Sequence, residues 1–274
     1  MTDYQFETHQ PVQLYVELGA GTVSAQAEET TESRVQVTGR DADRVVVDYD
    51  GDHLNVIAPK DRTGFLSGDR KLDIRITVPT DSRLQAKSGS ADITARGRYS
   101  TTHVRTGSGD VSLDACEGAA LVETGSGDIR LRSAGGPLRI KSGSGDVVVD
   151  HTGDAVSVST GSGDVQLGAS EGPVQVKTGS GDLKVAEANT DVSMSTGSGD
   201  LVIGTARRGR VTAKGASGDV QVGIPAGVPV WTDVSTVSGR ISSSLNGAGE
   251  PQDGADYVEL RAKTVSGDIV LTEK

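Results

Sequence analysis

The sequence predicts an all-β fold, a parallel β-solenoid built from eighteen-residue coils with two strands in each coil. Three observations predict it. The tetrapeptide Gly-Ser-Gly-Asp recurs at one fixed interval, apolar and polar residues alternate between its copies, and 37 glycines accompany only 3% aromatic residues. Self-similarity at a short fixed period is typical of repeat architectures, in which stacked units share one core.

The repeated tetrapeptide ends at an aspartate that precedes a strand. Its intact copies end at Asp110, Asp128, Asp146, Asp164, Asp182 and Asp200, and degenerate copies end at Asp92, Asp219 and Asp268. Counted from each aspartate, positions 1, 3, 10 and 12 hold mainly aliphatic residues, with polar residues between them. Alternation with a period of two indicates half-buried strands, so each coil is expected to contribute four inward aliphatic side chains.

Two kinds of turn join these strands. In the Gly-Ser-Gly-Asp turn the two glycines allow positive φ, and the aspartate is expected to cap the turn by accepting local backbone N–H groups. The other turn contains Gly-Pro or Gly-Ala, as at Gly172-Pro173, where proline fits because its missing donor lies outside the ladder. Stacking then places equivalent residues of consecutive coils about 4.8 Å apart.

The ends depart from the repeat, so three parts are expected: an N-terminal β cap or irregular first coils (1–85), the regular solenoid (86–223), and C-terminal coils and a cap (224–274). The first part should contain a hairpin at Asp50–Asp52 and a loop at 61–70, with strands at 12–17, 22–27, 34–38, 44–49, 53–58 and 72–78. In the last part an insertion covers 246–255, and the final coil is expected at 257–263 and 269–272. Trp231 is expected to cover the open end of the core, because terminal repeats need a cap.

Charge and composition exclude several classes of function. A net charge of −11 and few aromatic residues disfavour nucleic acid as a partner, because phosphates need cations and bases need stacking partners. A single cysteine excludes an intrachain disulfide and a cysteine-rich metal site. The aliphatic runs are too short for a transmembrane segment. The first residues include early acids and no apolar run of signal-peptide length, so a cytoplasmic location is expected.

The repeated Thr-Gly-Ser-Gly-Asp-Val segments and the strand LDIRITVP at 72–79 resemble the bacterial DUF4097 family of β-strand-repeat proteins, which are labelled as adhesins. The related head GIN adhesin domains are similar in style. The resemblance is specific from Leu72 onward and weaker before it. It implies a β-solenoid fold and a bacterial source. The family has no established activity or catalytic residues, so the resemblance implies no site residue.

The candidate site is the row of aspartates that stacking would create along one edge, formed by Asp110, Asp128, Asp146, Asp164, Asp182 and Asp200. A row of carboxylates can bind Ca²⁺, which takes oxygen ligands. Turn capping by the same side chains is the favoured interpretation, because like charges about 5 Å apart in water repel by only ~1 kcal/mol. Calcium-binding nonapeptide repeats also supply an aspartate in every nonapeptide, whereas this sequence supplies one in each coil, at twice that spacing.

No arrangement typical of catalysis is found in the sequence. The turn serines are equivalent, and the four histidines share no spacing that would pair them with a nucleophile or a metal. We therefore expect a non-enzymatic structural or interaction module, a rigid acidic solenoid that needs no cofactor and binds an unknown protein or polymer. Self-association through sheet edges is a further option. Two alternatives stay open: an adhesin or cell-envelope-binding module, and a Ca²⁺-dependent β-roll.

Overall fold

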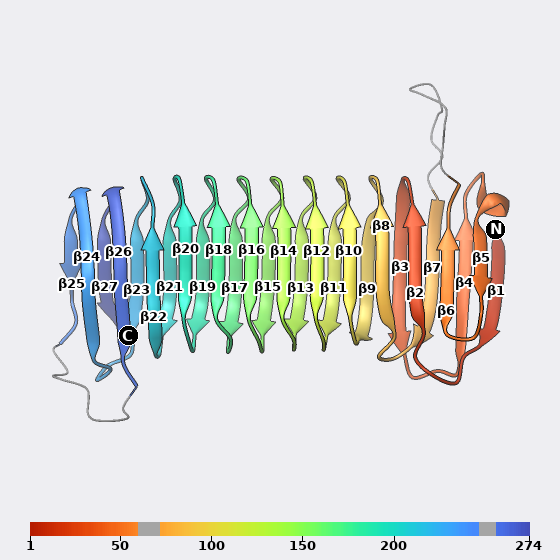
Figure 1. Cartoon of the computed structure of the whole chain (residues 1–274), viewed down its shortest axis with the longest axis horizontal. Coiled ribbons are helices and arrows are strands. Elements are labelled where there is room, and N and C mark those ends of the chain that lie inside the picture. The colour runs from red at the N-terminus through yellow and green to blue at the C-terminus, as the bar shows by residue number, and fades with distance from the viewer. Residues whose placement is uncertain (60–71, 247–255) are drawn as a thin grey trace, which may run out of the picture. The chain divides into compact units, whose positions relative to one another are not determined.

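The computed structural model describes residues 1–59, 72–246 and 256–274. It divides into two compact units, Met1–Gly136 and Pro137–Lys274. Within the described ranges both units are built from strands, apart from one 3₁₀ turn at Ala42–Arg44 (Figure 1). The all-β, solenoid-type prediction is confirmed. The predicted loop at 61–70 and residues 247–255 of the predicted insertion lie outside the described residues, and the predicted division at residues 85 and 223 stays a prediction.

The first unit contains two sheets that are parallel except at the N-terminal end. One has the strand order β1-β4-β7-β3-β9-β11-β13, and the other the order β5-β6-β2-β8-β10-β12. The strands are β1 (Thr2–Glu7), β2 (Gln13–Leu18), β3 (Gly21–Glu28), β4 (Glu32–Thr38), β5 (Val46–Tyr49), β6 (His53–Ile57), β7 (Leu72–Pro79), β8 (Arg83–Ser88), β9 (Asp92–Tyr99), β10 (Thr102–Thr106), β11 (Val111–Cys116), β12 (Ala120–Thr124) and β13 (Ile129–Ala134).

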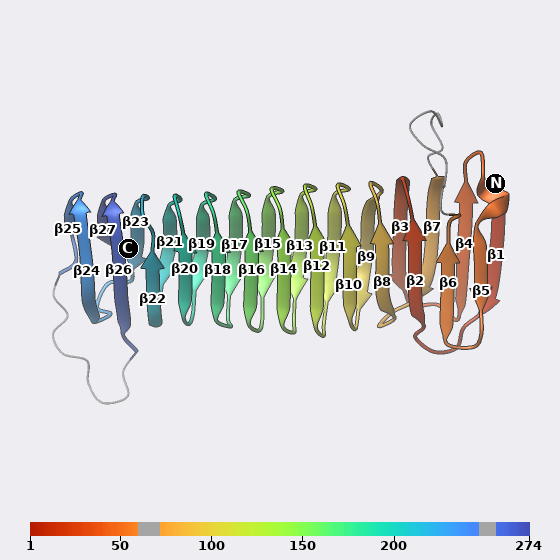
Figure 2. The same ribbon diagram turned by 45° about the horizontal axis from the view of Figure 1, so that its top comes forward.

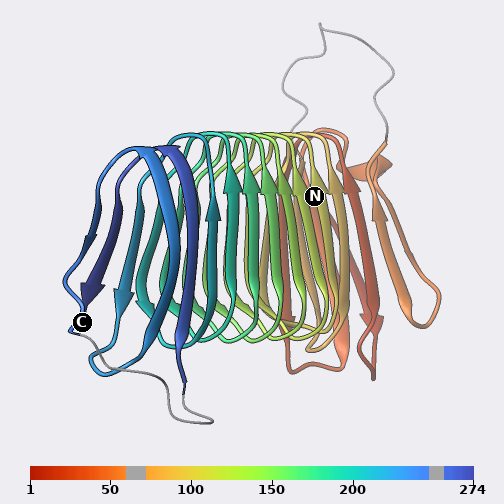
Figure 3. The same cartoon turned by 60° about the vertical axis from the view of Figure 1, so that its left-hand side comes forward.

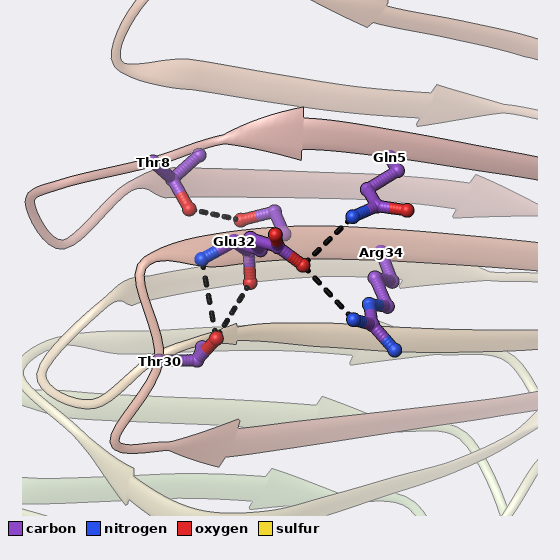
Figure 4. A network of polar contacts seen from close by, with 6 residues as sticks. Gln5, Thr8, Thr30, Glu32 and Arg34 are labelled. Atoms are coloured by element: carbon purple, nitrogen blue, oxygen red, sulfur yellow. Dashed lines mark hydrogen bonds and ion pairs between the residues drawn. The ribbon is translucent and has the colours of Figure 1, made fainter.

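Antiparallel strands form the N-terminal cap. β4 pairs antiparallel with both β1 and β7, and β5 and β6 form the predicted hairpin, in which the Asp50 N–H donates to the His53 carbonyl at 3.2 Å. Strand β1 was not expected from the sequence. Polar contacts tie it to β4, because the Glu32 carboxylate accepts hydrogen bonds from Gln5 and Arg34 at 2.7 and 2.9 Å (Figure 4). The Arg34 hydrogen bond lowers the pKa of Glu32.

The second unit contains two sheets in which every described pairing is parallel. Their strand orders are β15-β17-β19-β21-β23-β27-β25 and β14-β16-β18-β20-β22-β26-β24. Figure 3 shows the two sheets facing each other, with turns joining them at both edges. The strands are β14 (Leu138–Ser142), β15 (Val147–Thr152), β16 (Val156–Thr160), β17 (Val165–Ser170), β18 (Val174–Thr178), β19 (Leu183–Ala188), β20 (Val192–Thr196), β21 (Leu201–Ala206), β22 (Gly209–Lys214), β23 (Val220–Ile224), β24 (Val230–Ser238), β25 (Ile241–Ser243), β26 (Val258–Ser266) and β27 (Ile269–Glu273).

The core of each coil contains the four predicted aliphatic side chains and two more residues. In the coil of β17 and β18 the aliphatic ones are Val165, Leu167, Val174 and Val176, all at most 3% exposed. Position 6 of the repeat is also buried and holds a small residue, here Ser170, whose hydroxyl donates to a turn carbonyl at 2.8 Å. The hydroxyl residue before the Gly-Ser-Gly-Asp turn is buried as well in this coil, where it is Thr178, whereas Thr196 in the next coil is half-buried. The hydroxyls of Ser170 and Thr178 are tolerated in the core because each is hydrogen-bonded.

The final coil expected at 257–263 and 269–272 is formed by β26 and β27, but it does not lie at the end of the stack. Strand β26 lies between β22 and β24, and β27 lies between β23 and β25 (Figures 1 and 2). The coil of β24 and β25, which is earlier in the sequence, is therefore the outer one. The sequence does not reveal this insertion, because both coils carry the same alternating pattern.

The expectation that Trp231 covers the core is wrong. Trp231 pairs with Glu259 of β26 and points away from the core, with its side chain 52% exposed. The guanidinium of Arg261 lies 5.6 Å from the centre of its ring. The alternation of β24 explains this placement, because Val230, Thr232 and Val234 pair with buried residues of β26 and the residues between them point outward.

Candidate functional site

The structure brings the predicted aspartates into a hydrogen-bonded row in each unit. In the first unit, the Oδ1 of Asp92 accepts the N–H of Asp110 at 3.0 Å, and the Oδ1 of Asp110 accepts the N–H of Asp128 at 2.9 Å. The second unit repeats this contact from Asp146 to Asp164, Asp182, Asp200, Asp219 and Asp268, at 2.7–2.9 Å. The row ends where the Oδ1 of Asp268 accepts the N–H of Arg240.

These aspartates cap the next coil and not their own turn, which differs from the expectation. The local contact is made by the hydroxyl residue before the turn: the Oγ1 of Thr178 accepts the N–H of Gly181 at 2.9 Å, and Thr124 does the same for Gly127 at 3.0 Å. Each aspartate therefore links one coil to the following one through a charge-assisted hydrogen bond. The row therefore helps to hold stacked coils together, a role that the spacing of the aspartates in the sequence does not show.

Metal-ligating atoms converge elsewhere. Within the described ranges, three such atoms lie within 4.8 Å of one another only at Asp50, Asp52 and His53, all exposed, in the turn between β5 and β6. The Nδ1 of His53 lies 2.6 Å from a carboxylate oxygen of Asp52, so these two side chains already contact each other. Calcium binding by Asp110, Asp128, Asp146, Asp164, Asp182 and Asp200 stays a prediction.

The turn glycines are required by close stacking. The positive φ that glycine allows is not adopted at Gly127 and Gly181, and among the motif glycines it occurs at Gly218 and Gly267, with φ of 142° and 147°. A Cβ added at Gly181 would lie 2.0 Å from the carbonyl oxygen of Gly163 in the preceding coil. The backbones of consecutive turns therefore approach too closely for any side chain.

The outward face of the first sheet in the second unit carries a groove that the sequence reasoning missed. It is open, has a volume of about 370 Å³, and lies across β15, β17, β19 and β21. Two parallel rows of residues line it: Val148, Gln166, Lys184 and Val202 in one, and Asp150, Gly168, Ala186 and Gly204 in the other. The signal in the sequence is the small residue at position 4 of three consecutive coils, Gly168, Ala186 and Gly204.

Local packing restricts the residue at position 4 most clearly at Gly168. The pairing register between β15 and β17 passes from Val149–Leu167 to His151–Ala169 and skips the residue between them. The backbones approach closely at that residue, and a Cβ at Gly168 would lie 2.1 Å from the carbonyl oxygen of Asp150. The groove therefore lies where glycine and alanine at position 4 of consecutive coils leave little side-chain bulk on the outward face.

The groove has a mixed chemical character. Asp150 and Lys184 are its charged residues, so their charges offset each other in a chain whose net charge is −11. Val148 and Val202 are half-buried on the same face, although outward positions of other strands are mainly polar. Such a surface can bind an extended segment through apolar contact and exposed backbone groups.

Two buried titratable side chains of the first unit, Tyr99 and Cys116, lie in neighbouring strands. Burial raises the pKa of both side chains above their ordinary values. The thiol of Cys116 donates to the hydroxyl of Thr102 at 3.3 Å. Since a reactive cysteine needs an exposed, low-pKa thiolate, this pair is expected to be chemically inert.

The fold and the repeated contacts define a repeat protein of the parallel β-solenoid class, in which each coil bonds only to its neighbours. The sequence model described as Toastrack DUF4097 matches residues 13–133, 85–173 and 139–272. Together these matches span most of the sequence, and the chain belongs to the DUF4097 (Toastrack) family. The resemblance seen in the repeats is therefore confirmed.

Several crystal structures are similar over the whole chain at low sequence identity. A "putative lipid binding protein" from Parabacteroides distasonis ATCC 8503 is 12% identical, with 100% of this chain and 96% of that chain covered and a TM-score of 0.48. A "putative adhesin" from Bacteroides fragilis NCTC 9343 is 13% identical, with 100% and 96% covered and a TM-score of 0.37. No curated protein matches the sequence. No helix in the described part of the chain has the length and hydropathy needed to cross a bilayer.

Proposed function

We propose that the chain is a non-enzymatic interaction module whose binding surface is the groove across β15, β17, β19 and β21. The observation that carries the proposal is the groove itself, which is open to solvent on the outward face of these four strands. Its partner is an extended protein or polymer segment, because the groove crosses four strands. A volume of about 370 Å³ is in the range of ligand sites, which is roughly 300–1,000 Å³.

The way the strands stack supports a binding role. β15, β17, β19 and β21 pair in parallel with the same register at each step, so the groove residues of β17, β19 and β21 lie in strands that are paired on both sides, except at position 4. A surface fixed in this way loses little conformational entropy when a partner binds. The pairing of stacked coils therefore holds the groove in place before a partner binds.

Catalysis is disfavoured by the same regularity. A hydrolytic or transfer site needs a nucleophile, a base and an orienting group that differ from their surroundings. The groove offers one carboxylate, Asp150, and one amine, Lys184, and its other members are valine, glutamine, glycine, alanine and leucine. A glycosidase would need two carboxylates at a set separation.

Site-specific crosslinking tests the proposal. A photoreactive p-benzoylphenylalanine replaces Ala186 in the groove, and in a matched control it replaces Gln175, which is exposed on the other sheet at β18. Both full-length chains are irradiated with soluble and envelope fractions of the bacterium that encodes the chain. We expect a discrete adduct at position 186, competed by unmodified chain and less well by Lys184→Glu.

The identity of the adduct distinguishes the open alternatives. A soluble protein would make the chain an intracellular scaffold, and an envelope protein or polymer would make it an adhesin-like module. Equal crosslinking at positions 186 and 175, or an adduct that Lys184→Glu competes as well as the unmodified chain, would contradict a role for the groove.

A further inference from the structure

The outer coil of the second unit has free strand edges. β24 pairs with β26 alone and β25 pairs with β27 alone within the described residues, so each is the last strand of its sheet. An unpaired edge presents a row of N–H and C=O groups that can pair with another strand.

The alternation of backbone bonds shows which groups of β24 face this edge. The N–H of Val258 donates to the carbonyl of Pro229, and in a parallel pair successive bonds involve alternate residues. The backbone groups of Trp231 and Asp233 are therefore directed at β26. Those of Thr232, Val234 and Thr236 are directed at the free edge.

Exposed apolar side chains gather around the same edge. Trp231, Val237 and Ile241 are 52%, 82% and 52% exposed. Tyr257 and Val265, next to and within β26, are 48% and 55% exposed. The common protections of an edge strand, a proline, a lysine or an inward charge, are missing from Val230–Ser238.

The sequence of β24 is self-complementary about its centre. If two β24 strands pair antiparallel about a two-fold axis at Val234, Thr232 lies opposite Thr236 and Asp233 lies opposite Ser235. Trp231 then lies opposite Val237, which joins the two most exposed apolar side chains of the strand. Aromatic–β-branched and Thr–Thr pairs are favourable cross-strand pairs, and no like charges meet directly.

We infer that this edge is a dimer interface, in which a second copy of the chain pairs its β24 antiparallel to the first about Val234. The outward-directed backbone groups of Thr232, Val234 and Thr236 supply the hydrogen bonds. Such an interface is isologous, so it closes at two copies and does not continue as a fibre. The inference is independent of the groove and of its partner.

Charge gives the dimer a distinct signature. Each copy carries a net charge of −11, so the two repel at long range. Salt screens this repulsion, with a Debye length of about 30 Å at 0.01 M and about 8 Å at physiological ionic strength. The dissociation constant of the dimer should therefore fall as salt is added.

Analytical ultracentrifugation of the full chain tests the interface. Val237→Glu places a charge opposite Trp231 of the other copy and should raise the dimer dissociation constant at least tenfold. The matched control, Val46→Glu, alters an exposed valine at the outer strand of the first unit and should leave the constant unchanged. A chain that stays monomeric up to roughly millimolar concentration, or a dimer broken only by Val46→Glu, would overturn the inference.

Cysteine crosslinking tests the register. In the inferred dimer the two Val234 residues face each other as a hydrogen-bonded pair about 5.5 Å apart at Cα, within the range that a disulfide spans. Val234→Cys should form a dimer under mild oxidation at least tenfold faster than Thr232→Cys, whose two copies are separated along the strand. Thermal melting checks that both variants are folded. Equal rates, or faster crosslinking of Thr232→Cys, would overturn the two-fold axis at Val234.

Discussion

Replacement of Gly127 by alanine tests whether close contact between turns holds the coils of the first unit together. Gly127 lies in the turn between β12 and β13, and a Cβ there would lie 2.0 Å from the carbonyl oxygen of Gly109. Cβ atoms do not approach such atoms more closely than 3.0 Å, so the two turns must separate by about 1 Å.

The expected magnitude follows from the hydrogen bonds next to this contact. The N–H of Asp128 donates to the carboxylate of Asp110 at 2.9 Å, and the N–H of Val111 donates to the carbonyl of Asp128 at 2.8 Å. A separation of about 1 Å breaks both bonds, at a cost of roughly 1.5–3 kcal/mol for the charged acceptor and 0.5–1.5 kcal/mol for the neutral one. Alanine also restricts the unfolded chain, which offsets about 0.4–1 kcal/mol. The free energy of unfolding should fall by about 1.5–3.5 kcal/mol.

Urea denaturation followed by circular dichroism measures this loss as a lower transition midpoint. The matched control is Gly19→Ala, since a Cβ at Gly19 meets no heavy atom within 4 Å and its φ is ordinary. The control should stay within about 0.5 kcal/mol of the unmodified chain. A midpoint for Gly127→Ala equal to that of Gly19→Ala would refute the reasoning, because the stacked backbones would then have room that the structure does not show.

Four further predictions concern the aspartate row and the buried side chains. Asp182→Ala should lower the free energy of unfolding by about 1.5–3 kcal/mol, because the Asp200 N–H loses its charged acceptor at 2.8 Å. Asp182→Asn keeps an oxygen acceptor and should lower the free energy of unfolding by less than ~1 kcal/mol. If urea titrations show the same loss of stability for Asp182→Ala and Asp182→Asn, the carboxylate does not act as the proposed acceptor. The melting temperature should be the same with Ca²⁺ and with chelator, because these carboxylates already accept N–H groups, and a rise of several degrees with Ca²⁺ would show binding. Burial raises the pKa of Tyr99 above its unfolded value, so the stability that this neutral side chain supports is present below pH ~10 and is lost as the pH rises further. In denaturation curves measured across that pH range, Tyr99→Phe should reduce the loss of stability. A pH profile of stability that Tyr99→Phe leaves unchanged would contradict this role of Tyr99. The Cys116 thiol should react with a disulfide reagent at least tenfold more slowly in the native chain than in urea, and similar rates would contradict its burial.

The sequence predicted the coil well because the repeat encodes it many times. The spacing of Val165, Leu167, Val174 and Val176 by two residues within each strand is a direct consequence of pleat geometry, and it recurs in each copy of the repeat. The hairpin at Asp50–Asp52 was predictable for a similar reason, since its turn residues are local.

The features that the sequence did not predict depend on contacts between coils. The Asp182 carboxylate can bond its own turn or the next one, and only the distance to the Asp200 N–H, 2.8 Å, distinguishes the two. Glycine is compatible with positive φ and with close approach, so Gly181 does not reveal which applies. The groove at Gly168 and Gly204 lies where the register skips a residue, and such irregularities have no strong local signal.

The position of β26 and β27 inside the stack sets an order of assembly during protein synthesis. Residues 230–243 leave the ribosome before residues 258–273, but β24 and β25 pair only with strands from that later segment. The growing stack must therefore stop at β22 and β23 until the later segment has emerged. During that interval β24 and β25 have no pairing partner within the chain, and a chaperone or a second nascent chain could occupy them first.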